Sequence, residues 1–347
     1  MKKHILSIAA VLVAVASFAQ TSYTVSNNPA NPAQFTEIQA AINAASDGDT
    51  IYVAGSNIRY GNMLVNKRLV LIGAGYQLLG VNSRTEVTQL DIVSDTDNGG
   101  GSESTISGFL IVGDFDGDTD QIISGVVLER NWFNNVNLRF RNNEGWNFRN
   151  NIVYMSSNGG AYDFKTGTAM NLTVQNNILQ GDDRDARLVV NSTSALVLNN
   201  VFFDYYFQLN DCTLLNNIFI NHRFNTDFNG TFFDAFSNNV FYSNNIFFAG
   251  LSNPSGTSNT FINSIFDNPG FVSEDNQFYS FGEDLNLTTA SPGKSAGTDG
   301  TDIGVFGGNF PMVFEPANPE ITQLLINTVQ VPVGGELEFT VQAEGRQ

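Results

Sequence analysis

The chain has 347 residues and a formal net charge of -18, with 42% hydrophobic and 14% charged residues. This composition can bury a sizeable core, and it excludes an acidic disordered chain. The 16 Lys and Arg against 34 Asp and Glu argue against nucleic acid or an anionic membrane as a partner, because both need a basic face.

Residues 1–19 are predicted to be a secretory signal peptide. Lys2 and Lys3 precede a mostly apolar run from Ile5 to Val15, and small residues follow at cleavage spacing, ending at Ala19. No other stretch is long and apolar enough to span a bilayer. We therefore expect a secreted protein, extracellular or at the cell surface, with the periplasm as an alternative and without membrane insertion.

A short amphipathic helix followed by a buried strand is expected over residues 35–54. Thr36 and Gln39 fit a capping box at the start of this helix. Apolar residues at helical spacing are Phe35, Ile38, Ala41, Ile42 and Ala45. Because the rest of the chain has the pattern of short strands, the helix is predicted to plug an open end of a β-structure.

Seven Asn-Asn dipeptides share one frame, with apolar or aromatic residues two positions before the first Asn and two positions after it. Asn tolerates the left-handed conformation, so the unit predicts a strand, a tight bend and a strand that keep the same side inward. Most separations, 16 to 26 residues, are coil lengths of a solenoid. The first residues of the seven pairs are Asn134, Asn150, Asn176, Asn199, Asn216, Asn238 and Asn244.

Stacked coils would align these asparagines in a ladder along the solenoid axis, each amide bonding to the next. The alternative is an antiparallel sandwich with Asn-rich hairpin turns. Hairpins favour Asn-Gly or Asp-Gly, and no Asn-Gly pair lies in the repeated frame. The coil is therefore the preferred interpretation.

Two glycine-rich stretches, 291–297 and Asp302-Ile-Gly-Val-Phe-Gly-Gly308, resemble the closing segment of the right-handed parallel β-helix family, the pectate-lyase-like superfamily. Residues 35–53 resemble its N-terminal cap, and 106–113 and 123–131 resemble its coils. The resemblance covers roughly 35–310. It implies an all-β, right-handed parallel β-helix solenoid with an N-terminal capping helix. It implies no single activity, because the superfamily includes lyases, hydrolases and adhesins.

Three parts of the chain are expected: the signal peptide, a parallel β-helix domain at 20–310, and a C-terminal strand appendage at 311–347. Two strands, 321–331 and 337–341, are predicted in the appendage. Two strands cannot sustain a domain alone, so they are expected to cover the open edge of the last coil. A truncated interaction module is the alternative.

Four aspartates at alternate positions are the candidate metal ligands: Asp114, Asp116, Asp118 and Asp120. In a loop they could converge on Ca²⁺, but along a flat strand they could not. The segment departs from the EF-hand pattern, because Thr119 stands where Gly is needed and Gly125 where the bidentate Glu is needed. The alternative interpretation is a solvated acidic loop.

No catalytic residue is assigned. The Gly-His-Gly and Arg-x-Lys segments of the family's hydrolases are absent, and the Asp and Arg cluster at 182–187 fits a charged turn better than a catalytic pair. Trp132 and Trp146 are expected in the core. Sugars stack on aromatic faces, so the candidate carbohydrate-binding residues are Tyr205, Tyr206, Arg139 and Arg141.

The expected function is that of a secreted, monomeric, non-catalytic β-helix protein that binds a polysaccharide or a cell-surface glycan. One alternative is a polysaccharide lyase or glycoside hydrolase acting on acidic polysaccharide. The other is a structural, adhesin-like rod.

Overall fold

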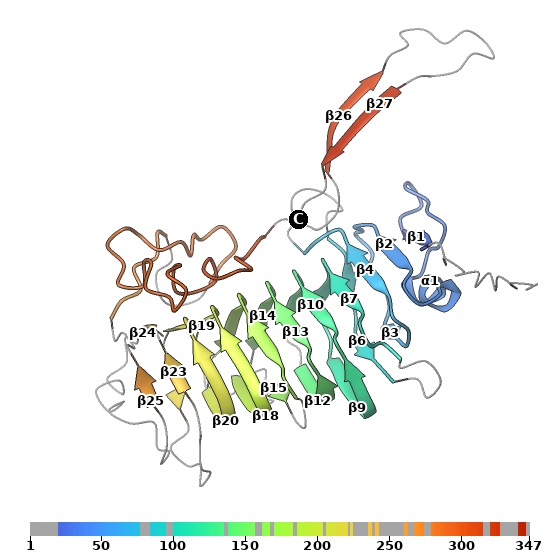
Figure 1. Ribbon diagram of the computed structural model, residues 1–347. Helices are drawn as coiled ribbons and strands as arrows, with labels where there is room; N and C mark the ends of the chain where they lie inside the picture. Colours follow the sequence, from blue (N-terminus) through green and yellow to red (C-terminus); the bar gives the residue numbers. More distant parts are fainter. Residues whose placement is uncertain are drawn as a thin grey trace, which may run out of the picture.

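Short strands stack into three ladders that form the three faces of a right-handed parallel β-helix (Figure 1). The computed structural model describes residues 20–76, 84–94, 100–134, 138–156, 162–166, 170–182, 186–203, 206–220, 223–224, 235–237, 240–242, 260–262, 267–273, 279–314, 320–326 and 339–344. The predicted signal peptide, 1–19, lies outside these residues and stays a prediction.

The first ladder runs the length of the solenoid, and each of its strands pairs in parallel with the strand of the next coil. Its strands are β1 (Ser22–Val25), β2 (Thr50–Val53), β4 (Val70–Gly73), β7 (Thr105–Ser107), β10 (Val127–Glu129), β13 (Asn147–Arg149), β16 (Thr173–Gln175), the second halves of β18 (Ala186–Leu198) and β20 (Tyr206–Leu215), β23 (Ala235–Ser237) and β25 (Thr260–Ile262).

The second ladder is a separate parallel sheet. Its strands are β5 (Glu86–Val87), β8 (Leu110–Ile111), β11 (Trp132–Asn134), β14 (Ile152–Ser156), β17 (Ile178–Asp182), β19 (Val201–Phe203), β21 (Ile218–Ile220) and β24 (Val240–Tyr242). The third ladder comprises β3 (Met63–Val65), β6 (Leu90–Ile92), β9 (Phe115–Ser124), β12 (Leu138–Glu144), β15 (Tyr162–Thr166), the first halves of β18 and β20, and β22 (Arg223–Phe224).

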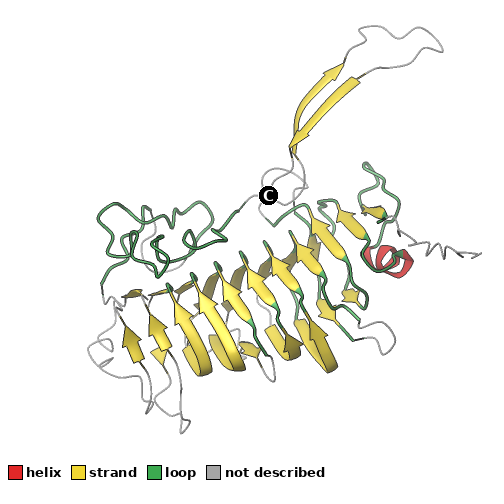
Figure 2. Cartoon of the chain, viewed as in Figure 1, coloured by secondary structure: helices red, strands yellow, loops and turns green. Residues whose placement is uncertain are grey.

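The helix α1 (Ile38–Ala44) closes the N-terminal end of the solenoid, as Figure 2 shows, and buries Ile38, Ala41 and Ile42. The predicted capping box is wrong, because the N-cap residue is Glu37 and no side-chain hydrogen bond caps the N-terminal end of the helix. Gln39 instead bonds the backbone of Leu64 in β3, where its Oε1 accepts from N–H at 2.9 Å and its Nε2 donates to the carbonyl at 3.3 Å. The helix is thus fixed to the first coils.

The paired asparagines form the corners between the first and second ladders. The first Asn of a pair is left-handed, with φ between 52° and 56° at Asn150, Asn176, Asn199 and Asn216. The prediction is therefore confirmed at these four pairs. It is wrong at Asn134, which lies inside β11; the corner of that coil is Arg130-Asn131, with φ 54° at Arg130. Asn238 and Asn244 lie outside the described residues.

The second residue of each corner points inward and builds the expected amide ladder. Asn151 Nδ2 donates to the Leu128 carbonyl at 2.8 Å, and the backbone N–H of Asn151 donates to Oδ1 of Asn177 at 2.8 Å. The same pattern recurs along the members of the ladder, which are Asn131, Asn151, Asn177, Asn200 and Asn217. All five side chains are buried.

The prediction that both apolar positions of the frame face inward is wrong for the position after the corner. Phe148 belongs to the hydrophobic cluster inside the solenoid, whereas Ile152 belongs to a second hydrophobic cluster on the outside of the solenoid. One left-handed residue reverses the strand alternation, so Asn151 and Val153 face inward and Ile152 faces outward. The same outward position holds Ile178, Val201 and Ile218.

A C-terminal strap, defined here as residues 267–273 and 279–314, covers this outward apolar face of the second ladder (Figure 1, orange). The strap contributes buried apolar residues to the second cluster, namely Phe271, Tyr279, Leu285, Leu287, Ile303, Val305 and Met312. The left-handed corner residues, such as Asn150, Asn176, Asn199 and Asn216, form a row along the axis that we call the corner row. The backbone of the strap docks on this row, because Asn176 Nδ2 donates to the carbonyls of Val305 at 2.9 Å and Gly307 at 2.8 Å.

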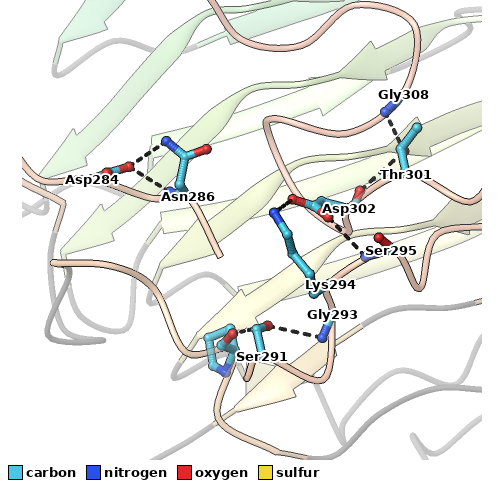
Figure 3. Close-up of polar contacts among 10 residues, drawn as sticks. Asp284, Asn286, Ser291, Gly293, Lys294, Ser295, Thr301, Asp302 and Gly308 are labelled. Carbon is cyan, nitrogen blue, oxygen red and sulfur yellow. Dashed lines mark hydrogen bonds and ion pairs between the residues drawn. The ribbon is translucent and has the colours of Figure 1, made fainter. Parts of the chain in front are cut away.

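Polar contacts inside the strap hold its irregular course (Figure 3). Asp302 accepts from Lys294 Nζ at 2.6 Å and from the Ser295 N–H at 2.9 Å. Close packing explains the glycines of the closing motif: a Cβ on Gly304 would lie 2.7 Å from Cδ1 of Ile218, and one on Gly307 would overlap the carbonyl oxygen of Asp302.

The C-terminal appendage contains the two expected strands, β26 (Glu320–Ile326) and β27 (Phe339–Glu344), which pair antiparallel. That residues 311–347 cover the last coil stays a prediction. Trp146 is buried as expected, and its Nε1 donates to the Ile123 carbonyl at 2.8 Å. Trp132 is not in the interior, because it lies on the outward face of the second ladder against Phe281 of the strap.

Candidate functional site

The third ladder brings together residues that the sequence suggested for two different roles. Asp116 and Asp118 lie in β9, and the parallel register places Arg139 opposite Asp116 and Arg141 opposite Asp118 in β12. Asp114 directly precedes β9, and Asp120 lies within it. Tyr206 begins β20 in the same ladder, whereas Tyr205 lies outside the described residues. Apart from Tyr205, the candidate metal and carbohydrate residues therefore lie in, or directly before, strands of one ladder.

One row of this ladder changes sign along the solenoid axis. The register runs from Asp91 through Asp116 and Arg139 to Lys165, one residue in each successive coil. Neighbouring positions in a ladder are about 4.8 Å apart, so the register makes Asp116 and Arg139, residues of opposite charge, neighbours in the middle of the row. We call these four positions the charged row.

The acidic end of the charged row carries mutual repulsion. Burial is the main cause that raises the pKa of Asp91 above its ordinary value, and the charges of Asp116 and Asp114 raise it further. The hydrogen bond from Gln89 Nε2, at 2.8 Å, opposes this shift. Asp91 is thus the carboxyl of this face whose ionisation costs the folded state.

The expected calcium site stays a prediction. Phe115–Ser124 is a strand, whose same-face side chains stand about 6.8 Å apart, rather than a loop that could wrap a cation. Among the side chains that the structure describes, no group of three His, Cys, Asp or Glu could hold a metal ion. The side chains of Asp118 and Asp120 lie outside that part.

A second polar surface lies on the first ladder, where β10 and β13 meet the strap. Arg149 is bound to Glu129 through Nε at 2.8 Å and through Nη2 at 2.6 Å. The guanidinium carbon of Arg149 also lies 4.5 Å from the ring centre of Phe310, in a cation–π contact. The Phe310 ring is 41% exposed. An apolar ring and a fixed ion pair therefore stand side by side at the surface.

Two amide side chains, those of half-buried Asn147 and buried Gln175, continue from this surface into the next coil. Gln175 Nε2 donates to Oδ1 of Asn147 at 3.0 Å, and the register places Gln175 beside Arg149. We call Glu129, Asn147, Arg149, Gln175 and Phe310 the Arg149–Phe310 surface. Its donors and acceptors are held by three adjacent ladder strands, β10, β13 and β16, and by one another, so their positions are fixed before any ligand arrives.

No motif in the sequence marks this surface. Phe310 lies two residues after the closing motif, in which only the glycines are distinctive, and Arg149 is one of several arginines in the coils. The available signal was local: Arg149 directly precedes an Asn-Asn corner, and its position two residues after Asn147 places both on one face of a strand.

Two hollows of about 510 Å³ each lie at the N-terminal end. One is lined by residues of β1 and β2, including Val25 and Tyr52, and by Pro32 of the loop that follows β1. The other is lined by polar residues between α1 and the first coils, including Glu37, Gln39 and Arg59. Arg59 is already paired with Glu86, so the second hollow has no unpaired basic group among its lining residues.

Comparison with protein-family models found no match, and comparison with curated proteins found none either. Over the described residues, no helix has both the length and the apolar character needed to cross a membrane.

Proposed function

We propose that this protein is a secreted, non-catalytic β-helix that binds glycan chains on its outer faces. The observation that carries the proposal is the Arg149–Phe310 surface, where an exposed ring lies beside an ion pair and two amides. A sugar offers an apolar face that stacks on an aromatic ring and hydroxyl groups that bond to planar polar side chains.

The geometry of the solenoid supports a polymeric ligand over a single sugar. Equivalent side-chain positions repeat about every 4.8 Å along the axis, and the strands that carry them are rigid. The charged row on the third ladder adds a second polar track along the same axis. A chain that follows the axis would meet equivalent positions in successive coils, which favours extended polysaccharides.

The test is binding of the mature chain to a panel of neutral and uronate-containing polysaccharides by calorimetry. Phe310→Ala is expected to weaken binding about tenfold or more with an unchanged melting temperature, because the ring is exposed. Val272→Ala is the matched control, since Val272 is a 54% exposed apolar residue of the same strap and should leave affinity unchanged. Equal affinities of the two variants and the native chain would contradict the proposal.

The same incubations test the catalytic alternative. Reducing ends or unsaturated sugars that accumulate with acidic polysaccharide, and that depend on native protein, would identify a lyase or hydrolase instead. The secretion part is tested separately by N-terminal sequencing of exported protein, which should begin at or near Gln20. A protein retained inside the cell with its first 19 residues intact would overturn that part.

A further inference from the structure

The strap covers the corner row in two different ways. Over the coils of β16 to β21 it bonds the corner asparagines: Asn176 reaches the Val305 and Gly307 carbonyls, and Asn216 Oδ1 accepts from the N–H of Thr298 at 2.9 Å. Only one amide group there, Nδ2 of Asn199, is buried without a partner among the described residues.

Over the earlier coils the strap presents aromatic rings. Phe281 packs edge-on against Trp132, with ring centres 4.9 Å apart, and its ring centre lies 6.1 Å from that of Tyr76. Tyr279 lies behind it, 5.9 Å from the Phe281 ring centre. These rings bury the polar groups beneath them, and a phenylalanine side chain can offer those groups no hydrogen bond.

Three donors are consequently buried here with no hydrogen-bond partner in the described part of the chain. They are the Tyr76 hydroxyl, Nε of Arg130 and the indole Nε1 of Trp132. One acceptor, Oδ1 of Asn150 in the neighbouring coil, is also buried without a hydrogen-bond partner among the described residues. Native proteins leave few buried polar groups unpaired, and such a cluster calls for a water, an ion or a ligand.

The charge of the cluster favours an anion. Arg130 makes no ion pair with a described carboxylate, unlike Arg149 one coil later, which is held by Glu129. Burial and the neighbouring Tyr279 raise the pKa of Tyr76, so its hydroxyl stays protonated at neutral pH and remains a donor. A guanidinium, an indole N–H and a phenol O–H together form a donor set suited to carboxylate oxygens.

The choice of residue at this corner also points to a ligand. The corner position is left-handed in every described coil from β7 to β21, and it is Gly108, Arg130, Asn150, Asn176, Asn199 or Asn216. Gly and Asn suit this conformation, whereas Arg does not. The chain therefore accepts backbone strain at Arg130, which stands two residues before Trp132 and whose charge lowers the pKa of the Tyr76 hydroxyl against the larger effect of burial. Such strain is found where function imposes the residue.

We infer that Tyr76, Arg130 and Trp132 form a binding site for a carboxylate group, closed by the ring of Phe281. Asn150 Oδ1 supplies an acceptor for a hydroxyl group close to that carboxylate. A uronic acid at the end of a glycan and a free hydroxy acid share this chemistry. Phe281 is 44% exposed, so its ring can move outward without crossing the core. The site is separate from the Arg149–Phe310 surface and does not depend on it.

The experiment measures melting temperature and tryptophan fluorescence of the mature chain with D-galacturonate and with D-galactose, which lacks the carboxylate. Galacturonate is expected to raise the melting temperature and to change the emission of Trp132, whereas galactose does neither. Glycolate separates the two sources of the carboxylate: an equal shift identifies small hydroxy acids as ligands, and a shift with galacturonate alone identifies uronates. No shift with either acid overturns the inference.

Two variants distinguish a ligand site from a structural cluster. Arg130→Asn should leave the ligand-free melting temperature unchanged or higher, because Asn suits the left-handed corner, and should abolish the galacturonate shift. Tyr76→Phe should be equally stable and bind at least about fivefold more weakly. The matched control is Tyr60→Phe, whose hydroxyl donates to the Ala54 carbonyl at 2.9 Å, so this variant should lose stability and keep the shift.

Retention of the full shift in Arg130→Asn would overturn the inference, and so would a loss of ligand-free stability in Tyr76→Phe as large as that in Tyr60→Phe. Phe310→Ala should keep the galacturonate shift. The experiments therefore distinguish a failure of glycan binding at the Arg149–Phe310 surface from a failure of carboxylate binding at Tyr76, Arg130 and Trp132.

Discussion

Nδ2 of Asn177 lies 2.9 Å from Oδ1 of Asn200 in the next coil. The same nitrogen donates to the Phe148 carbonyl at 2.8 Å, and its own Oδ1 accepts the N–H of Asn151 at 2.8 Å. A single buried amide thus joins three successive coils and leaves none of its polar atoms unpaired. This contact explains why the corner needs Asn at its second position and not merely a small polar residue.

Asn177→Ala should therefore destabilise the fold strongly. The substitution leaves the Asn151 N–H and the Phe148 carbonyl buried without their partners, which we expect to cost about 2–4 kcal/mol of unfolding free energy. Urea denaturation measures the change. Asn309→Ala is the control, because Asn309 is exposed on the strap, and it should stay within about 0.5 kcal/mol. Similar losses at both sites would show that the ladder contributes nothing special.

The corners also show how far the sequence could predict the fold. Asn-Asn correctly indicated bends in a parallel coil, because Asn adopts the left-handed conformation readily. It did not indicate that one left-handed residue reverses the alternation, which is why Ile152 faces outward. An outward row of aliphatic side chains needs a cover, so this error concealed the reason for the strap.

The candidate sites were harder to predict for a related reason. Asp116 and Arg139 are 23 positions apart, and only the register of β9 and β12 makes them neighbours. Tyr76 and Trp132 both contact the ring of Phe281, which the chain brings back from about 150 residues downstream of Trp132. Local sequence patterns carry no information about contacts between residues so far apart in the chain. The glycines at 304 and 307 were a local signal, because they indicated a tightly packed segment.

Gly307→Ala should release the strap. A Cβ at this position would overlap the Asp302 carbonyl oxygen and lie 2.8 Å from Nδ2 of Asn199. We expect a loss of about 2–3 kcal/mol, and a red shift of Trp132 emission as Phe281 leaves the indole. Gly61→Ala is the matched control, since its Cβ would have nothing within 4 Å. An unchanged emission spectrum together with native stability would contradict the docking described here.

Lys67→Met should loosen the N-terminal cap. The Lys67 ammonium donates to the carbonyls of Ile42 at 2.9 Å, Asn43 at 3.0 Å and Ala45 at 2.7 Å, so it closes the C-terminal end of α1. Its removal should cost about 1–2 kcal/mol and speed hydrogen exchange in Ile38–Ala44.

The neighbouring Arg68→Met is the control for the Lys67 variant. Arg68 makes only an exposed ion pair with Glu103, at 3.2 Å, and its loss should change stability by less than about 1 kcal/mol. Equal exchange rates of the helix in the two variants would exclude the capping role of Lys67.

Asp91→Asn should stabilise the protein at neutral pH. Burial, and then the charges of Asp116 and Asp114, raise the folded-state pKa of Asp91 above its unfolded value. The folded state therefore holds this proton more tightly than the unfolded state does, and stability falls as the pH rises through the folded-state pKa. The amide removes that penalty while its oxygen can still accept the Gln89 hydrogen bond.

The stability gain of Asp91→Asn should be full above the folded-state pKa of Asp91 and should vanish as the pH falls to its unfolded-state pKa. Denaturation of both proteins across this range measures it, with the exposed Glu144→Gln as a control of equal charge change. A gain that stays constant with pH would show that the ionisation of Asp91 is not its cause.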